Sequence, residues 1–123
     1  MLDQSGTMSV RVYTAGGALP IENAIIRITG AEEANRDVYY SLLTDRDGIT
    51  NTVLLPAPKK TLSQSPDPAE APFAIYDVEV SKDGYFNRKI YGNQVFADTN
   101  SELLIELTPA SPYELPNYNA DME

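Results

Sequence analysis

The side chains that could carry chemistry in this chain are carboxylates and tyrosines. The 123 residues include 18 Asp and Glu and eight Tyr, but no His and no Cys. The chain therefore lacks the usual general base at neutral pH, the commonest transition-metal ligand, disulfides and Cys-ligated zinc. Acid–base catalysis would instead require two carboxylates facing each other across a cleft, as in glycosidases.

No pair of acids has that arrangement in the sequence. Asp77 and Glu79 lie two apart on one strand face, Glu32 and Glu33 are adjacent in a polar loop, and Asp83 sits in a turn. Outward acids on strands are normally solvated, so we expect no catalytic residues, no cofactor and no enzyme activity.

The segment TDRDGIT at 44–50 starts like a calcium-binding loop. Asp45 and Asp47 are two apart and Gly48 follows, but position twelve counted from Asp45 is Pro56, where an EF-hand needs a bidentate Glu. We therefore expect a hairpin turn that Asp45 caps and Gly48 completes in a left-handed conformation, and no metal site.

The tyrosines suggest a binding surface. Tyr85, Asn87, Lys89 and Tyr91 would share one face of a regular strand at 85–91. Tyrosine combines an apolar ring with a polar tip, so this strip could bind a sugar or a protein. The alternative is an ordinary half-covered face of a sandwich. Tyr76 is expected in the core, with its hydroxyl bonded to a loop.

These residues must be positioned by strands, because apolar residues recur with a period of two. Gly, Pro, Asp and Asn clusters separate the alternating segments, as turns require. No helical stripe is present, although EEANRD at 32–37 could form one helical turn. The pattern predicts an all-β, seven-stranded β-sandwich with strands at 8–13, 24–29, 38–44, 49–55, 76–81, 85–91 and 103–108.

A Pro- and Ser-rich stretch at 57–72 separates the fourth and fifth predicted strands. Cutting the chain there would leave two pieces of roughly 55 residues, each with half a core. We expect instead a long crossover loop of a Greek-key sandwich, which either packs on the domain or acts as a recognition loop. The predicted organisation is an N-terminal tail at 1–6, one sandwich domain at 7–109 and an extended acidic C-terminal arm at 110–123.

The C-terminal arm holds Tyr113, Leu115 and Tyr118 among acids and prolines. Prolines give the segment an extended bias and exclude a helix. It is either a disordered acidic tail or an arm that docks on a neighbouring subunit or adds as a strand to a sheet edge.

The order of the motifs resembles the carboxypeptidase regulatory-like domain of the transthyretin-like (prealbumin-like) β-sandwich superfamily. The matching positions span about 7–109 and are Pro20, Ile21, Ala24, Thr44, Asp45, Gly48, Tyr76, Val78, Val80, Gly84, Tyr85, Leu107 and Pro109. The phrase LPAPKKTLSQSP before FAIYDVEV resembles modules of Firmicutes, some attached to spore cortex-lytic and peptidoglycan-binding proteins. The resemblance implies an accessory role, because the enzymatic branch of the superfamily relies on histidines that this chain lacks.

The charge limits the class of partner. The net charge is −9, and residues 90–123 hold six acids and no base. No basic patch favours nucleic acid or an anionic membrane surface, so we expect neither as a partner. The first residues have no basic or apolar signal region, so we expect synthesis in the cytoplasm without a signal peptide.

Together these features predict a non-catalytic structural module that contacts a protein partner or forms a homo-oligomer through its loops and its arm. Such a subunit could belong to a multiprotein particle, such as a spore layer or phage-like assembly, that is released from the cell. The alternative is a carbohydrate-binding accessory domain that acts on peptidoglycan in cell-wall turnover.

Overall fold

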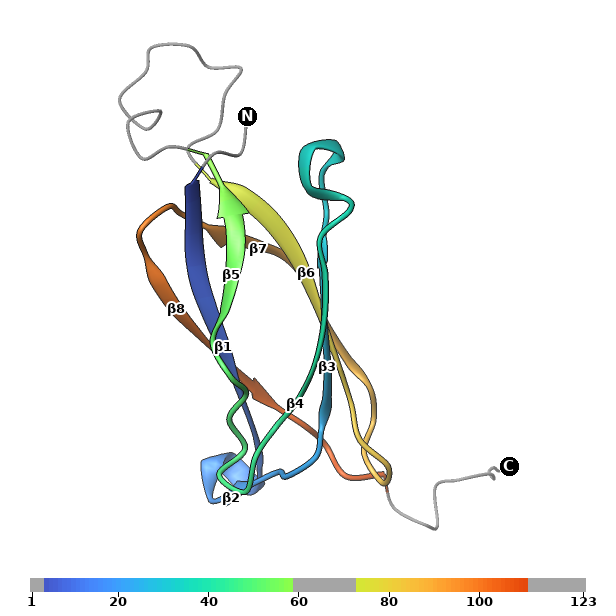
Figure 1. Cartoon of the computed structure of the whole chain (residues 1–123). Helices are drawn as coiled ribbons and strands as arrows, with labels where there is room; N and C mark the ends of the chain where they lie inside the picture. Colours follow the sequence, from blue (N-terminus) through green and yellow to red (C-terminus); the bar gives the residue numbers. More distant parts are fainter. Residues whose placement is uncertain (1–3, 59–72, 111–123) are drawn as a thin grey trace, which may run out of the picture.

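The chain folds as an all-β sandwich of two sheets (Figure 1). The structure is a computed structural model that describes residues 4–58 and 73–110. Its strands are β1 (Gln4–Thr14), β2 (Leu19–Pro20), β3 (Ile25–Gly30), β4 (Tyr39–Leu43), β5 (Val53–Ala57), β6 (Ala74–Ser81), β7 (Arg88–Val95) and β8 (Asn100–Glu106). Two short 3₁₀ turns, Ala15–Gly17 and Glu33–Asn35, complete the described elements.

The first sheet is built around β1. Strand β8 runs parallel to β1 on one side, with Val10 opposite Leu103. Strands β5 and β2 run antiparallel to β1, pairing with its start and its end respectively. Backbone hydrogen bonds from Val12 to Gly48 and from Thr50 to Val10 fill the gap between β5 and β2.

The second sheet has the strand order β4-β3-β6-β7, and all its pairs are antiparallel. Strands β4 and β7 are therefore its two edges. The outer surface of this sheet holds most of the residues considered below as a candidate site.

The core lies between the two sheets and follows from strand alternation. Strand β6 shows the pattern most clearly, since every second residue from Ala74 to Val80 is buried. Outward residues of the same strand are polar or half-exposed, as expected where one face of each sheet packs on the other. The largest fully buried side chains are Tyr76, Ile26, Ile28, Leu55, Ile105 and Leu107.

The all-β sandwich predicted from the sequence is confirmed, with changes in detail. All seven predicted strands are present, and the short strand β2 adds an eighth where a turn was expected. Strand β1 begins at Gln4, so residues assigned to an N-terminal tail are part of the first sheet. Only the last three residues of the predicted strand at 49–55 lie in β5, which begins at Val53.

The turn predicted at 44–50 is also confirmed. The Asp45 carboxylate accepts hydrogen bonds from the backbone N–H groups of Asp47 and Ile49, at 2.9 and 3.0 Å. Gly48 has φ +78, the left-handed region that glycine tolerates best. The single turn expected within 32–37 is the 3₁₀ turn Glu33–Asn35, which a reciprocal capping box closes.

The long crossover falls largely outside the described residues, which stop at 58 and resume at 73. Neither the packed loop nor the recognition loop can therefore be compared with the structure. Among the described residues there is no long apolar helix of the kind that crosses a membrane.

Candidate functional site

A bulge interrupts the pairing of the edge strand β7 next to Tyr91. Tyr76 pairs with Asn93, whereas Val78 pairs with Ile90, so Tyr91 and Gly92 both lie opposite Asp77. The extra residue is accommodated by Gly92, whose φ is +73. Such bulges occur at sheet edges and re-aim the side chains that they carry. Tyr91, beside the bulge, is 69% exposed.

Two side chains hold the bulge in place. The Gly92 N–H donates to the Asp77 carboxylate at 3.0 Å. The Asn93 amide donates to the carbonyl oxygens of Tyr76 and Ile90, at 3.1 and 2.9 Å. These bonds satisfy backbone groups that the regular ladder leaves free, so the bulge is a built feature of the strand.

Around Tyr91 the outer face of the sheet forms a shallow hollow of about 160 Å³. A row of alternating charge crosses three strands there, because Arg27 pairs with Glu79 and Glu79 pairs with Lys89. Opposite charges therefore flank the exposed ring. An aromatic face beside hydrogen-bond donors and acceptors suits a polar ligand with apolar surfaces.

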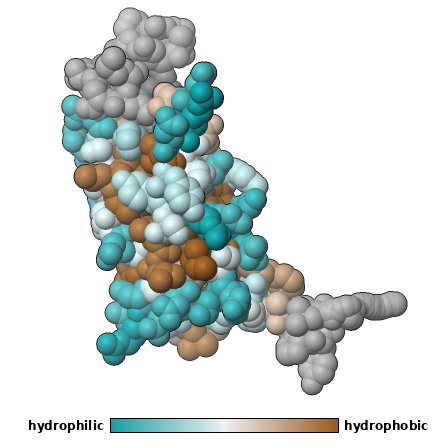
Figure 2. Space-filling model, turned by 45° about the vertical axis from the view of Figure 1, so that its right-hand side comes forward, coloured by the Kyte–Doolittle hydropathy of each residue, from teal (hydrophilic) through white to brown (hydrophobic). Residues whose placement is uncertain are grey.

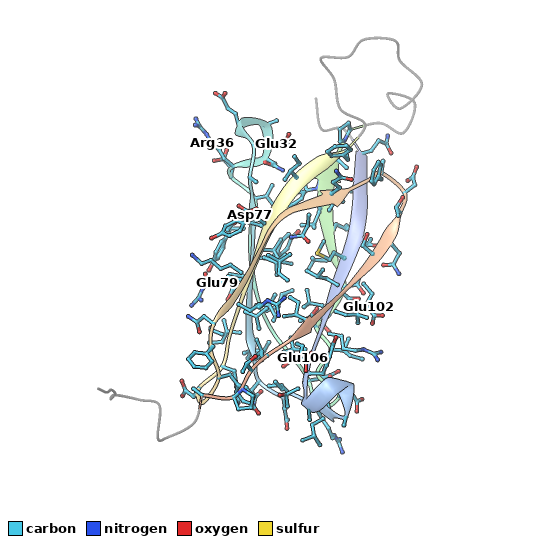
Figure 3. All side chains as sticks on the ribbon, turned by 180° about the vertical axis from the view of Figure 1, so that it is seen from behind. Glu32, Arg36, Asp77, Glu79, Glu102 and Glu106 are labelled. Carbon is cyan, nitrogen blue, oxygen red and sulfur yellow. The ribbon has the colours of Figure 1, made fainter. Side chains whose placement is uncertain are left out.

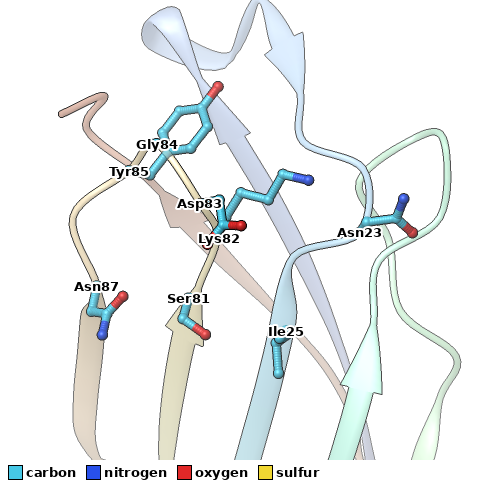
Figure 4. Close-up of a pocket in the computed structure, with 8 residues that line it drawn as sticks. All are labelled: Asn23, Ile25, Ser81, Lys82, Asp83, Gly84, Tyr85 and Asn87. Atoms are coloured by element: carbon cyan, nitrogen blue, oxygen red, sulfur yellow. The ribbon is translucent and has the colours of Figure 1, made fainter. Parts of the chain in front are cut away.

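A second hollow of about 320 Å³ lies at the end of the same sheet (Figure 4). Its lining comes from the turn between β6 and β7 and from the start of β3. The lining residues are Asn23, Ile25, Ser81, Lys82, Asp83, Gly84, Tyr85 and Asn87.

The predicted strip of four residues is therefore divided. Strand β7 begins at Arg88, so Tyr85 and Asn87 precede it, and the predicted strand bounds of 85–91 are wrong. Tyr85 packs partly against the core and lines the second hollow with Asn87. Lys89 and Tyr91 line the first hollow. A binding role for these four residues stays a prediction.

The physical reason for this shift is a competing partner strand. After the turn at Gly84, the backbone of Phe86 donates to the carbonyl oxygen of Thr108 at 3.0 Å. Ala110 in turn donates to the carbonyl oxygen of Gly84 at 2.8 Å, and Tyr85 and Pro109 form an isolated bridge. Residues 84–86 thus pair with the chain after β8 instead of continuing the β6–β7 ladder.

This pairing also fixes the position of Ala110, where the described part of the chain ends. Ala110 is the last described residue and lies at the β6–β7 turn (Figure 1). Tyr113, Leu115 and Tyr118, the predicted anchors of the arm, lie outside the described residues.

The acids of the two sheets point away from each other (Figure 3). Asp77 and Glu79 lie on one side of the sandwich, and Glu102 and Glu106 lie on the other. Glu32 has a structural contact, since its carboxylate accepts the Ile75 N–H at 3.0 Å. Within 4–58 and 73–110 no three carboxylates come together as a metal site would require.

Tyr76 is the tyrosine with a clearly shifted pKa. Burial raises the pKa of its hydroxyl above the ordinary value of 10.0, and a hydrogen bond with the Asn35 side chain partly opposes this effect. The side chain is fully buried. Its position in the core was predicted correctly. Its hydroxyl bonds to the carbonyl oxygen of Pro56 in β5 and, as predicted, also to a loop, through Asn35 of the 3₁₀ turn between β3 and β4.

Comparisons with known proteins show the fold and no family. No family model matches the chain, and no curated protein sequence matches it. Its structure is similar to part of the Bacillus anthracis TIE protein, with a TM-score of 0.56 and 15% identity over 87% of this chain and 17% of that one.

Two dioxygenases contain a similar sandwich. The catechol 1,2-dioxygenase of Acinetobacter radioresistens matches with a TM-score of 0.58 and 12% identity, over 95% of this chain and 57% of that one. The 3-chlorocatechol 1,2-dioxygenase of Rhodococcus opacus matches with a TM-score of 0.55 and 14% identity, over 88% of this chain and 62% of that one. The chain spans less than two thirds of each of these proteins. Identities this low show a shared small β-sandwich and carry no activity.

Sequence reasoning missed the β7 bulge. Its signal was present, because a glycine inside a strand pattern often marks a bulge, and Gly92 lies in YGNQV. The pairing of 84–86 with 108–110 had no such local signal.

Proposed function

We propose that this chain is a non-catalytic assembly module, a subunit of a multiprotein particle that makes its contacts through the C-terminal segment. A spore layer or a phage-like assembly would be such a particle, in keeping with the resemblance to Firmicutes carboxypeptidase regulatory-like domains. The observation that carries the proposal is the anchored exit of the segment at Ala110. Its backbone bond to Gly84 gives residues 111–123 a fixed starting point on the surface.

The composition of the segment supports this proposal. It contains two tyrosines and a leucine among acids and prolines, and no base. Burial of tyrosine and leucine side chains against a partner lowers the free energy of the complex. A tail that only keeps the protein in solution needs none of these side chains. Because prolines restrict the backbone, the segment loses less conformational entropy on docking than a glycine-rich tail would.

Light scattering on three forms of the protein tests the proposal. These are the full chain, a chain ending at Ala110, and a full-length variant with Tyr113→Ser, Leu115→Ser and Tyr118→Ser. The truncation follows Ala110 because a cut at Pro109 would remove the bond to Gly84. We expect the full chain to have at least twice the mass of the other two forms. Equal masses for all three would contradict assembly through the segment.

A second candidate function is a glycan-binding accessory domain in cell-wall turnover, and the hollow around Tyr91 favours it. An exposed aromatic ring can stack on the apolar face of a sugar, while Arg27, Glu79 and Lys89 offer hydrogen bonds to its hydroxyl groups.

Retention on purified peptidoglycan tests this second function. Tyr91→Ala should reduce retention at least tenfold, whereas Tyr39→Ala should not change it. Tyr39 is a matched control, because it lies on the opposite edge of the same sheet and is 57% exposed. Tyr85→Ala is less informative, since Tyr85 also packs against the core. Equal retention of the wild type and the Tyr91 variant would exclude the hollow as a glycan site.

A further inference from the structure

Strand β4 has an open edge whose backbone groups face away from the sheet. Gly30 donates to the carbonyl oxygen of Val38, and Thr44 donates to that of Ala24, at 3.2 and 3.1 Å. Even-numbered residues along β4 therefore bond to β3, so the backbone groups of Tyr39, Ser41 and Leu43 point to the other side. In the described part of the chain no hydrogen bond reaches those groups.

The other edge strands carry the protection that natural sheets use against unwanted pairing. Strand β7 has its bulge and the charged Arg88 and Lys89. Strand β8 carries Glu102 and Glu106, and the Arg88 guanidinium covers its last carbonyl oxygen at 3.0 Å. Strand β5 contains a proline. The sequence of β4, YYSLL, has no charge, no glycine and no proline, so it is the edge most suited to accept another strand.

The side chains beside this edge are apolar. Tyr39 and Leu43 are 57% and 60% exposed, and Leu43 lies opposite Ile25 of β3. On the inner face, Val38, Tyr40 and Leu42 pack against the core but remain partly exposed. The view that brings β3 and β4 forward shows apolar surface in separate patches among polar residues (Figure 2). An added strand would cover part of this surface.

The sequence of the C-terminal segment fits such an added strand. Its prolines, Pro112 and Pro116, are both even-numbered. In a strand, backbone N–H groups point alternately to the two edges, so both prolines would fall on one edge. Tyr113, Leu115 and Asn117 would then present their backbone groups to the opposite edge. The segment has one edge that can pair and one edge that blocks further pairing.

The side chains would also match in an antiparallel pairing. Residues directly opposite each other share a face of the sheet. If Leu115 lies opposite Ser41, then Tyr113 lies opposite Leu43 and Asn117 lies opposite Tyr39. Tyr113 would therefore lie directly opposite Leu43, and Leu115 would be a diagonal neighbour of both Leu43 and Tyr39.

In this register the segment does not reach the β4 edge of its own chain. Ala110 is held at the β6–β7 turn. From β6, an extra strand beyond β4 lies three strand spacings away, roughly 14 Å. The three residues from Ala110 to Tyr113 span at most about 11 Å. In this register the pairing therefore joins two chains.

We infer that residues 112–118 of one chain add as an antiparallel strand to the β4 edge of a second copy. This inference rests on the proposed assembly function and names the partner as the chain itself. A reciprocal exchange would give a closed dimer, and a one-way exchange would give a longer array.

The mass of four variants in light scattering tests the inference. Ser41→Pro removes an outward N–H without breaking a bond to β3, and Ser41→Ala is its matched control because it keeps that N–H. Leu115→Pro removes a donor on the pairing edge of the segment, whereas Glu114→Pro places a third proline on the blocked edge. We expect Ser41→Pro and Leu115→Pro to have the mass of one chain, and Ser41→Ala and Glu114→Pro to assemble like the wild type.

The segment variants keep the test valid even where Ser41→Pro disturbs the fold, because they change no residue of the described strands. Amide hydrogen exchange provides a second readout. The N–H groups of Tyr39, Ser41 and Leu43 should exchange at least tenfold more slowly in the full chain than in the chain ending at Ala110.

The outcomes separate the two proposals. If truncation after Ala110 halves the mass but Ser41→Pro and Leu115→Pro still assemble, the assembly function stands and the β4 pairing is overturned. If the full chain has the mass of one chain, both proposals are overturned. Unchanged exchange rates at Tyr39, Ser41 and Leu43 in an assembled chain also overturn the β4 pairing.

Discussion

The Tyr76 hydroxyl on β6 donates a 2.6 Å hydrogen bond to the carbonyl oxygen of Pro56 on β5, and so joins the two sheets through the core. Pro56 is the last residue but one of β5. Without the Tyr76 hydroxyl, its carbonyl oxygen would lack this hydrogen-bond donor. The bond thus satisfies a backbone acceptor and a buried hydroxyl at once. The bond also fixes the position of β5 relative to β6. The long connection separates these two strands along the chain.

Tyr76→Phe should destabilise the sandwich. The substitution keeps the ring but removes this part-buried hydrogen bond, and a bond of this kind contributes about 0.5–1.5 kcal/mol. Urea unfolding should show a free energy of unfolding lower by that amount. Tyr91→Phe is the control, because its hydroxyl lies on an exposed side chain and should change stability by less than about 0.5 kcal/mol. Equal unfolding midpoints for the two variants would contradict the structural role of the bond.

Stability should fall at alkaline pH in a way that depends on Tyr76. Burial raises the pKa of this hydroxyl above 10.0, so the folded state holds the proton more tightly than the unfolded state does. The resulting contribution is complete below pH 10 and is lost as the pH rises through the folded-state pKa. Free energies of unfolding measured between pH 8 and about pH 11.5 should decline less steeply for Tyr76→Phe than for the wild type. Identical slopes would show that ionisation of the Tyr76 hydroxyl does not affect the free energy of unfolding.

The fold class followed from the sequence because alternation reports which face of a strand is buried. Met8, Val10 and Val12, or Tyr76, Val78 and Val80, can satisfy a core only in an extended backbone. The Asp45 turn was equally local, since its capping bonds reach only two and four residues along the chain.

The candidate site was predicted less well, because it depends on contacts between distant residues. Tyr85 and Asn87 looked continuous with Lys89 and Tyr91, but residues 84–86 pair with 108–110. Predicting the open edge of β4 requires the order of the strands in the sheet. The alternation of apolar residues does not provide that order. The short strand β2 was hidden because Pro20 resembles turn punctuation.

The turn at 45–48 offers a test with a built-in control. Asp45→Ala removes the carboxylate that accepts two backbone N–H groups and should cost about 1 kcal/mol, typical of a lost cap at an exposed site. Asp47→Ala removes a neighbouring exposed acid whose carboxylate has no hydrogen bond among the described residues, and should change stability by less than about 0.5 kcal/mol. Thermal unfolding of both variants in one buffer measures the difference. A larger loss for Asp47→Ala would contradict the assignment of Asp45 as the cap.

The bulge at Gly92 allows a prediction in which the change in stability depends on backbone strain alone. A side chain added at Gly92 would meet no atom within 4 Å, so space does not limit the substitution. Its φ of +73, however, costs a residue with a Cβ roughly 1–2 kcal/mol, and asparagine tolerates this region better than alanine.

Gly92→Ala should therefore lower the free energy of unfolding by about 1 kcal/mol, and Gly92→Asn should lower it by less. Gly30 provides the contrast, because a Cβ there would collide with the backbone of Asn35, and Gly30→Ala should cost more than either variant. Urea unfolding of the three variants gives the ranking. A Gly92→Ala protein as stable as the wild type would mean that β7 passes Asp77 without a left-handed residue.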